Sequence, residues 1–277
     1  MLFDLHCHSN LSDGALSPEE LVQRAIDHDV DVLSITDHDC TTAYSQLREA
    51  GIPDTLNKLQ LVAGIEFSAQ WRNTAVHILG LNIDIDEQAM IEAVSLQQKA
   101  RRNRAGIIAE KLEKKGFKNI ISEVDKLDST TSIGRPHIAN ILVDAGVVKS
   151  VDEAFRKYLG AGKIGDVKNE WATLAQIIDW IRGAGGTALI AHPNKYQMTR
   201  TRLQELVGEF KDFGGHGLEV VSGNQDNHQS KTLAALCEEL KLLSCCGSDF
   251  HKPGQYWAEL GKHKPLPENC VPVWDHW

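Results

Sequence analysis

Two histidines near the start of the chain, His6 and His8, flank a single cysteine in the apolar segment FDLHCH. Side chains two residues apart on a β-strand point to the same side, so both imidazoles face one way and Cys7 faces the other. Two imidazoles on one face can chelate one metal ion. An isolated pair is more often structural, with each histidine hydrogen-bonded to a neighbour, so the interpretation depends on the rest of the sequence.

Further imidazole and carboxylate groups lie in or directly after other apolar segments. His38 follows VLSIT, and Glu66 follows LVAGI. His77 lies inside AVHILGL, where a buried structural histidine is the commoner explanation, and Asp13 lies in SNLSDG, where Asp-Gly is ordinary turn chemistry. Taken together, the positions outweigh these separate explanations. The nine predicted metal ligands are His6, His8, Asp13, His38, Glu66, His77, His192, Asp249 and His251.

This set of side chains indicates the kind of metal and the number of ions. Imidazole and carboxylate without thiolate suit manganese, iron or zinc, and we expect manganese, with zinc or iron as alternatives. A catalytic ion takes about three protein ligands and keeps open positions, so nine ligands predict two or three divalent ions. Glu66, as a carboxylate, is the expected bridge. The residues predicted to act in catalysis are Asp13, His38, His192 and His251.

The elements that must position these groups are predicted as seven short strands. They cover residues 2–8, 32–36, 61–66, 76–81, 187–191, 218–221 and 243–246. Helical patterns separate most of them, including one that starts at Ser17-Pro18 and one over 174–181. Because each strand carries His, Asp or Glu in it or at its carboxyl end, a barrel is favoured over an open doubly wound sheet. The predicted fold class is α/β, a (β/α)7 TIM-like barrel.

Between residues 84 and 170 the strand pattern disappears and helical patterns replace it. The sequence therefore predicts a barrel made of residues 1–83 and 171–277 with a helical insertion subdomain at 84–170. The insertion follows the fourth strand, so it emerges near the barrel mouth, where it would form part of the substrate site.

Bulk properties limit the protein class. A formal net charge of −9 over 277 residues argues against non-specific binding of nucleic acid. The amino terminus has no basic leader, and no long apolar run is present, so we expect a cytoplasmic protein without a membrane contact or an obligate protein partner. The six cysteines have no C-x-x-C spacing, which predicts reduced thiols.

Six motifs resemble those of the PHP (polymerase and histidinol phosphatase) family of metallophosphoesterases. They are HxHSxxSDG at residues 6–14, TDHD at 36–39, GIEFS at 64–68, VHILG at 76–80, AHP at 191–193 and SDFH at 248–251. They occur in family order across nearly the whole chain. The resemblance implies a distorted seven-stranded barrel, a trinuclear cluster on all nine ligand positions, and attack on phosphorus by metal-bound hydroxide.

Within that family, the insertion with RRNR and GRPH resembles the stand-alone members that act on nucleoside 3′,5′-bisphosphates and on short RNA 5′ ends. The implied reaction is removal of the 3′-phosphate, for example from 3′-phosphoadenosine 5′-phosphate, to give a nucleoside 5′-monophosphate. Short RNA would be degraded 5′ to 3′. The partner would then be a small nucleotide or short RNA.

Cationic side chains in the insertion are candidates for holding the distal phosphate, because a guanidinium matches phosphate in a bidentate way. Arg135 precedes Pro136 at a predicted helix start, where a phosphate also meets the helix N-terminus. A solvated helix face is an equally good explanation for residues 101–104. The predicted substrate-binding residues are Arg101, Arg102, Asn103, Arg104, Arg135 and Lys163.

Two alternatives stay open. A phosphatase for histidinol phosphate or another small phosphoester would use the same metals without the distal clamp. A non-catalytic metal- or nucleotide-binding module would share the fold and ligands without turnover. Glu219 is expected to orient a ligand, and Ser9, Ser12 and Ser68 to support turns or ligands. The histidines predicted to be structural are His28, His137, His216, His228, His263 and His276.

Overall fold

The computed structural model describes residues 1–56, 58–168 and 171–277. Its strands are β1 (Phe3–Cys7), β2 (Val32–Ile35), β3 (Thr55–Leu56), β4 (Leu59–Leu61), β5 (Gly64–Trp71), β6 (Thr74–Leu81), β7 (Thr187–Ile190), β8 (Gly217–Ser222) and β9 (Leu243–Gly247). Its α-helices are α1 (Pro18–Asp27), α2 (Thr42–Glu49), α3 (Gln88–Lys114), α4 (Ile120–Asp125), α5 (Arg135–Asp144), α6 (Val151–Ala154), α7 (Leu174–Gly183), α8 (Arg200–Asp212) and α9 (Asn227–Leu240). Short 3-10 or π turns lie at Phe155–Leu159, Pro193–Tyr196 and Val273–His276.

The strands form two sheets. One has the order β1-β2-β4-β3 and the other β5-β6-β7-β8-β9. Isolated bridges, Cys7 with Phe250 and His38 with Glu66, join the two sheets beside the predicted ligands. The α/β class is confirmed, but the strands of the described chain do not close into a barrel.

The strand directions also differ from the predicted all-parallel pattern. Strands β5, β6 and β7 pair antiparallel, whereas β7, β8 and β9 pair parallel. The cause is a hairpin: Trp71 pairs with Thr74, and Arg72 adopts a positive φ of 50° in the two-residue turn. The predicted third strand is likewise two strands, because β4 ends at Leu61 in one sheet and β5 begins at Gly64 in the other.

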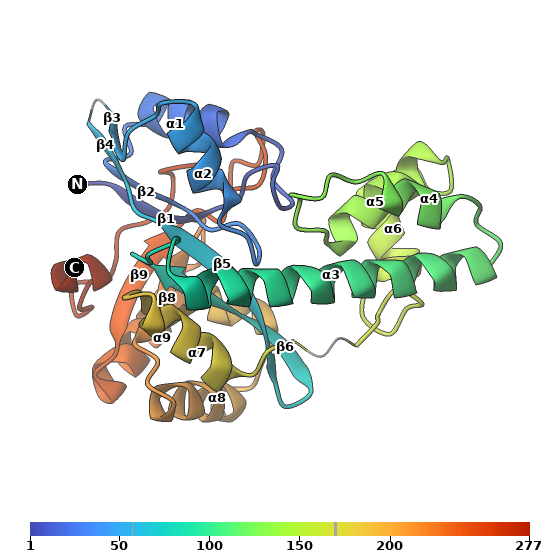
Figure 1. Ribbon diagram of the computed structural model, residues 1–277. Helices are drawn as coiled ribbons and strands as arrows, with labels where there is room; N and C mark the ends of the chain where they lie inside the picture. The colour runs from blue at the N-terminus through green and yellow to red at the C-terminus, as the bar shows by residue number, and fades with distance from the viewer. Residues whose placement is uncertain (57, 169–170) are drawn as a thin grey trace.

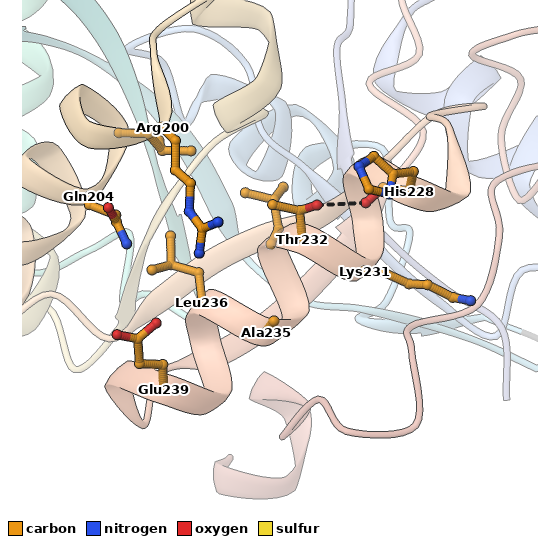
Figure 2. A pocket seen from close by; sticks show the side chains of 10 residues that line it. Arg200, Gln204, His228, Lys231, Thr232, Ala235, Leu236 and Glu239 are labelled. Carbon is orange, nitrogen blue, oxygen red and sulfur yellow. Dashed lines mark hydrogen bonds between the residues drawn. The ribbon is translucent and has the colours of Figure 1, made fainter.

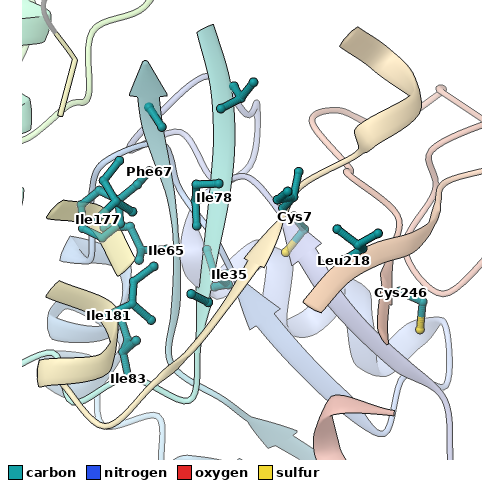
Figure 3. Packing of buried hydrophobic residues seen from close by; sticks show 14 of the residues in the cluster. Cys7, Ile35, Ile65, Phe67, Ile78, Ile83, Ile177, Ile181, Leu218 and Cys246 are labelled. Atoms are coloured by element: carbon teal, nitrogen blue, oxygen red, sulfur yellow. The ribbon is translucent and has the colours of Figure 1, made fainter. Parts of the chain in front are cut away.

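The main hydrophobic core joins residues of both sheets with residues of the helices that cover them. Figure 3 shows Ile177 and Ile181 of α7 against Ile65 and Phe67 of β5, all of them fully buried. Cys7 belongs to the same cluster, so the side of β1 opposite to the two histidines faces the core. The helix starts are as predicted: Ser17 caps α1 with its hydroxyl, and Pro136 lies in the first turn of α5.

Helix α3 is the longest element, and it runs from the sheets out to α4, α5 and α6 (Figure 1). Its 27 residues span about 40 Å. Met90 and Ala93 pack in the main core, whereas Ile108 and Leu112 pack in a separate cluster with α4 and α5. The buried residues between them include the polar Gln97 and the charged Arg101. The helix therefore links two apolar cores through a polar stretch.

No helix in the described ranges is long and apolar enough to cross a bilayer. All six cysteines are free thiols, as predicted, and burial raises the pKa of each above its ordinary value, which keeps them protonated at neutral pH.

Candidate metal centre

The structure brings the nine predicted ligands together in four overlapping groups, and within each group the ligand atoms lie within 4.8 Å of one another. The groups are His8, Asp13, His38 and His251; His6, His192 and Asp249; His6, His8 and Glu66; and His38, Glu66 and His77. Because the groups share members, they form one continuous cluster of imidazoles and carboxylates.

Strand β1 and the segment after β9 are tied together by the backbone. The amide of His8 donates to the carbonyl of Phe250 at 2.9 Å, and the amide of Asp249 donates to the carbonyl of His6 at 2.8 Å. A Cβ at Gly247 would lie 2.4 Å from the Cβ of His6, so only glycine permits this approach. This close packing places Asp249 and His251 beside the two β1 histidines.

Glu66 lies at the centre of the cluster, and its side chain is 1% exposed. Its Oε1 lies 2.9 Å from His77 Nδ1 and 2.9 Å from His192 Nε2. Its Oε2 lies 2.9 Å from His38 Nδ1 and 3.3 Å from His8 Nε2. One carboxylate thus faces imidazoles from opposite sides of the cluster, which is the arrangement expected of a bridging ligand.

Asp13 and Asp249 supply the remaining carboxylates. Asp13 Oδ1 lies 3.4 Å from His251 Nε2, and Asp13 Oδ2 lies 3.7 Å from His38 Nε2. Asp249 Oδ1 lies 3.2 Å from His8 Nε2. Each carboxylate therefore has imidazole nitrogens at distances that a shared cation can bridge.

Unpartnered atoms test whether this set of residues fits metal ions. Among the described residues, four buried ligand atoms have no hydrogen-bond partner: Asp13 Oδ1, His38 Nδ1, Glu66 Oε2 and His192 Nδ1. Buried polar atoms are normally hydrogen-bonded, since leaving one unpaired costs about 1–3 kcal/mol. Four in one cluster of imidazole and carboxylate donors fit a polynuclear centre of divalent cations.

The charge states of the ligand residues differ across the cluster. Burial, reinforced by the neighbouring His251, lowers the pKa of His8 to about 3, so its imidazole is neutral and has a free lone pair. Burial alone would raise the pKa of Glu66, but nearby imidazoles, chiefly His77 and His38, hold it well below its usual value. Burial also lowers the pKa of His6, His38 and His251, but neighbouring carboxylates outweigh it and raise the pKa, to about 9 for His251, so metal binding must displace protons from these imidazoles.

Groups behind the cluster hold the ligands in place. Glu219 Oε1 lies 3.1 Å from His6 Nδ1, and its other oxygen accepts a 2.6 Å hydrogen bond from the amide of His192. Asp37 accepts from the hydroxyls of Ser9 and Ser12, both at 2.5 Å, so it fixes the loop that carries Asp13. Ordered supports of this kind keep metal ligands in one geometry.

Arg101 is 6% exposed and reaches back to residues beside the nine-residue cluster. Its Nε donates to Asp39 Oδ2 at 2.6 Å, and its Nη2 donates to the hydroxyl of Ser68 at 2.8 Å. Asp39 directly follows His38. A solvated helix face therefore does not describe this residue, which instead anchors α3 to Asp39 and to strand β5.

Arg104 and Arg135 lie together, half-buried, further along the insertion. Each donates to a backbone carbonyl, Val167 for Arg104 and Leu159 for Arg135. Neither makes an ion pair with a described residue. Burial, and then the charges of Arg135 and Arg101, lower the pKa of Arg104 to about 10, which shows that the guanidinium groups repel one another. The cluster is a cationic surface suited to an anion.

The other predicted substrate residues lie elsewhere. Asn103 and Lys163 are exposed, and Arg102 donates to the backbone carbonyl of Asp128 at 2.7 Å. At about 100° per residue, Asn103 points away from the helix face shared by Arg101 and Arg104. The structure thus separates these three residues from the arginine cluster.

Sequence reasoning missed Lys195, which lies beside the cluster, and placed His137 among the structural histidines. Lys195, three residues after His192, forms an ion pair with Asp249. His137, which was expected to be purely structural, accepts a hydrogen bond from the amide of Gly134 at 3.1 Å. Burial lowers the pKa of its ring, and the negative charge of Asp13 partly offsets that shift. The only sequence signal for either is proximity to a motif, AHP for Lys195 and GRPH for His137.

A separate cavity of about 280 Å³ lies between α8 and α9 and is not part of this centre. Figure 2 shows its lining, with Arg200 and Gln204 on α8 facing Leu236 and Glu239 on α9. None of the nine clustered residues lines it. Its walls carry no cluster of ligands, so the metal centre remains the candidate site.

The fold and the nine-residue cluster together define a class of protein. The model of the PHP domain matches residues 4–213, and the chain belongs to the PHP domain family. It is 40% identical over 277 residues to the 5′-3′ exoribonuclease Rnm of Escherichia coli (strain K12), covering 100% of this chain and 94% of that protein. It is 39% identical over 272 residues to the 3′,5′-nucleoside bisphosphate phosphatase of Chromobacterium violaceum, covering 98% of this chain and 94% of that one.

A solved structure is similar along the whole chain. It is that of an amidohydrolase from Chromobacterium violaceum with bound sulfate and no metal, and it superposes with a TM-score of 0.87 at 37% identity. The alignment covers 100% of this chain and 95% of that one. The similarity therefore includes the helical segment as well as the sheets.

Proposed function

We propose that this protein hydrolyses the 3′-phosphate of nucleoside 3′,5′-bisphosphates and degrades short RNA from its 5′ end. It is a phosphoesterase of the same type as its two full-length relatives, the bisphosphate phosphatase and the exoribonuclease. The observation that carries the proposal is the convergence of nine imidazole and carboxylate side chains, four of whose buried atoms are unpartnered.

The nine clustered residues would hold two or three divalent ions, with manganese as the first choice. Such ions neutralise charge on a phosphoryl group and lower the pKa of water. The protein contributes the ordered frame: Glu219 holds His6, and Asp37 holds the loop of Asp13. The frame is built before substrate arrives, so little reorganisation is needed during the reaction.

The arginine cluster would hold the second phosphate. Arg104 and Arg135 make no ion pair within the described chain, although the carboxylate of Asp166 lies close enough to interact with both, and their mutual repulsion is relieved when an anion binds between them. Arg101, on the same face of α3, connects this cluster to Asp39 beside His38. Helix α3 would thus fix the position of the arginine cluster relative to the metal centre, where the substrate reacts.

This arrangement explains why one site serves both substrates. In either case a water oxygen bonds to phosphorus, the bond between phosphorus and O3′ breaks, and O3′ takes up a proton. A bisphosphate releases inorganic phosphate. RNA releases its first nucleotide as a 5′-monophosphate, and the cleaved phosphate stays on O5′ of the next nucleoside, which is the new 5′ end.

We further propose that residues 84–170 act as a substrate-binding subdomain on a barrel-like body formed by 1–83 and 171–277. The separate apolar cluster around Ile108 and Leu112 supports a unit with its own core. The arginine cluster lies on this unit, whereas all nine clustered residues come from the body.

The direct test is a phosphate-release screen with the manganese-loaded protein. Adenosine 3′,5′-bisphosphate should yield inorganic phosphate and adenosine 5′-monophosphate, and a 5′-phosphorylated short RNA should yield 5′-monophosphates. Faster turnover of histidinol phosphate would contradict the proposal, as would an adenosine 3′-monophosphate product.

A further inference from the structure

We propose that a cavity beside the metal centre binds the nucleoside that follows the scissile phosphate in RNA. The inference rests on the function proposed above and names a part of the site that a bisphosphate does not use. The cavity lies at the carboxyl ends of β8 and β9, against the segment that follows His251.

The cavity has a volume of about 390 Å³ and is continuous with the metal cluster, because Asp249 and His251 line both. Volumes of about 300–1,000 Å³ are usual for small-molecule sites. Lys195, whose ammonium group pairs with Asp249, also lines it and places a positive charge at the boundary with the metal centre. A group attached to the reacting phosphate would enter this space directly.

Polar groups on the cavity wall suit the edges of a base and the hydroxyls of a ribose. Asn224 is exposed there, and Ser222 has a buried hydroxyl with no hydrogen-bond partner among the described residues. The amide of Asn224 donates to the carbonyl of Trp257 at 2.7 Å. This bond fixes the wall to the loop that carries the aromatic residues.

Two aromatic side chains stand at the edge of the cavity. Trp257 lines it and is 51% exposed, and Tyr256, which is 80% exposed, packs edge-on against it with ring centroids 5.0 Å apart. Large aromatic rings expose apolar surface to water, which is unfavourable unless a ligand covers them. Nucleobases stack on such rings in proteins that bind single-stranded nucleic acid. A base is the occupant that fits an aromatic edge on a polar wall.

The position of the cavity favours the second nucleoside over the first. The cavity and the arginine cluster share no residue. The cavity adjoins the nine-residue cluster at Asp249 and His251. Helix α3, which carries Arg104, instead approaches that cluster at Asp39, beside His38, through Arg101. When the 5′-phosphate of the first nucleoside lies on the arginines and the scissile phosphate lies at the metals, the RNA continues toward the cavity from O5′ of the second nucleoside. A bisphosphate ends at the scissile phosphate and leaves the cavity to solvent.

The test compares two substrates that share the same first nucleoside and the same breaking bond. These are adenosine 3′,5′-bisphosphate and the 5′-phosphorylated dinucleotide of adenosine, each with the manganese-loaded protein. Trp257→Ala should lower kcat/KM for the dinucleotide about tenfold, the size expected for one lost stacking contact, and change the bisphosphate value less than twofold. Trp257→Phe should restore most of the loss. Trp277→Ala, which removes an exposed tryptophan outside the cavity, is the matched control.

A binding measurement separates stacking from turnover. The probe is a dinucleotide that carries 2-aminopurine as its second base and a methylene group in place of the bridging O3′, so that it binds but is not cleaved. Its binding to the wild type should quench the 2-aminopurine fluorescence. Trp257→Ala should abolish the quenching. Equal losses on both substrates, no loss on the dinucleotide, or a wild-type protein that cleaves only the bisphosphate would each overturn the inference. Absence of bisphosphate turnover in the wild type would instead overturn the proposed function.

Discussion

Glu66 Oε2 lies 2.9 Å from His38 Nδ1, yet neither atom has a hydrogen-bond partner within the described residues. Buried polar atoms are normally hydrogen-bonded, so both of these atoms remain available to bind a third species. A cation between carboxylate and imidazole satisfies both atoms at once. The account of this protein as a metallophosphoesterase depends on that relationship.

Replacing Glu66 with alanine should therefore remove metal and activity together. We expect a fall in kcat of more than about 100-fold, since even residues behind a metal ligand are worth about 10- to 100-fold. Elemental analysis should show at least one ion fewer per chain. Glu205→Ala, an exposed glutamate on α8, is the control. A Glu66→Ala protein with full metal content would contradict the bridging role.

Arg104 and Arg135 should discriminate between substrates with and without a 5′-phosphate. A hydrogen bond to a charged group contributes about 1.5–3 kcal/mol, so Arg135→Ala should lower kcat/KM for adenosine 3′,5′-bisphosphate about 10- to 100-fold. Adenosine 3′-monophosphate should be much less affected. Arg102→Ala provides the control on the same helix. Equal losses on the two substrates would exclude a clamp for the distal phosphate.

The buried ion pair between Arg101 and Asp39 should act mainly on stability. Arg101→Met leaves a buried carboxylate unpaired, a change that typically costs about 3–5 kcal/mol. Urea unfolding should show this loss, and adding Asp39→Asn to Arg101→Met should cost less than Asp39→Asn does alone. If Arg101→Met kept full stability and lost only turnover, Arg101 would be a substrate contact instead.

The pair between Arg24 and Glu259 should make stability depend on acid pH. Arg24 donates two hydrogen bonds to Glu259, at 2.9 and 2.6 Å. Burial raises the pKa of Glu259, but these bonds outweigh it and leave the pKa below its usual value. The stabilisation is thus fully present above the unfolded-state pKa of about 4.3, and it is lost as pH falls through the lower folded value.

Glu259→Gln should therefore lower the free energy of unfolding by about 1–2 kcal/mol at neutral pH, after allowance for the partial exposure of Arg24. The difference from wild type should shrink below about pH 4. The exposed pair of Arg72 and Glu205 is the control, and Glu205→Gln should have little effect at any pH. A difference that stays constant from pH 7 to acid would contradict this assignment.

The ligand positions could be predicted because strand periodicity is simple. His6 and His8 share one side of β1, and Cys7 enters the core on the other, as a period of two requires. The position of Asp249 just after β9 followed from the end of an apolar segment, whereas Glu66, which was predicted at the end of a strand, lies inside β5. The structure brings these residues together.

The sheet topology could not be predicted in the same way. The β5–β6 hairpin turns at Arg72 and Asn73. This dipeptide is not the Asn-Gly or Asp-Gly pair that marks a tight turn, so no signal in the sequence indicates that the chain reverses direction here. Nor could the sequence indicate that Arg101 is buried against Asp39, because that contact spans 62 residues. Lys195 was missed for the same reason, since its partner Asp249 is 54 residues away.

The most direct test of the central claim is to strip the protein with a chelator and titrate manganese back while measuring phosphate release from adenosine 3′,5′-bisphosphate. We predict no release from the stripped protein and full recovery at two to three bound ions per chain, with His8→Ala and Asp249→Ala failing to recover. Undiminished phosphate release from protein shown by elemental analysis to be free of metal would contradict the account.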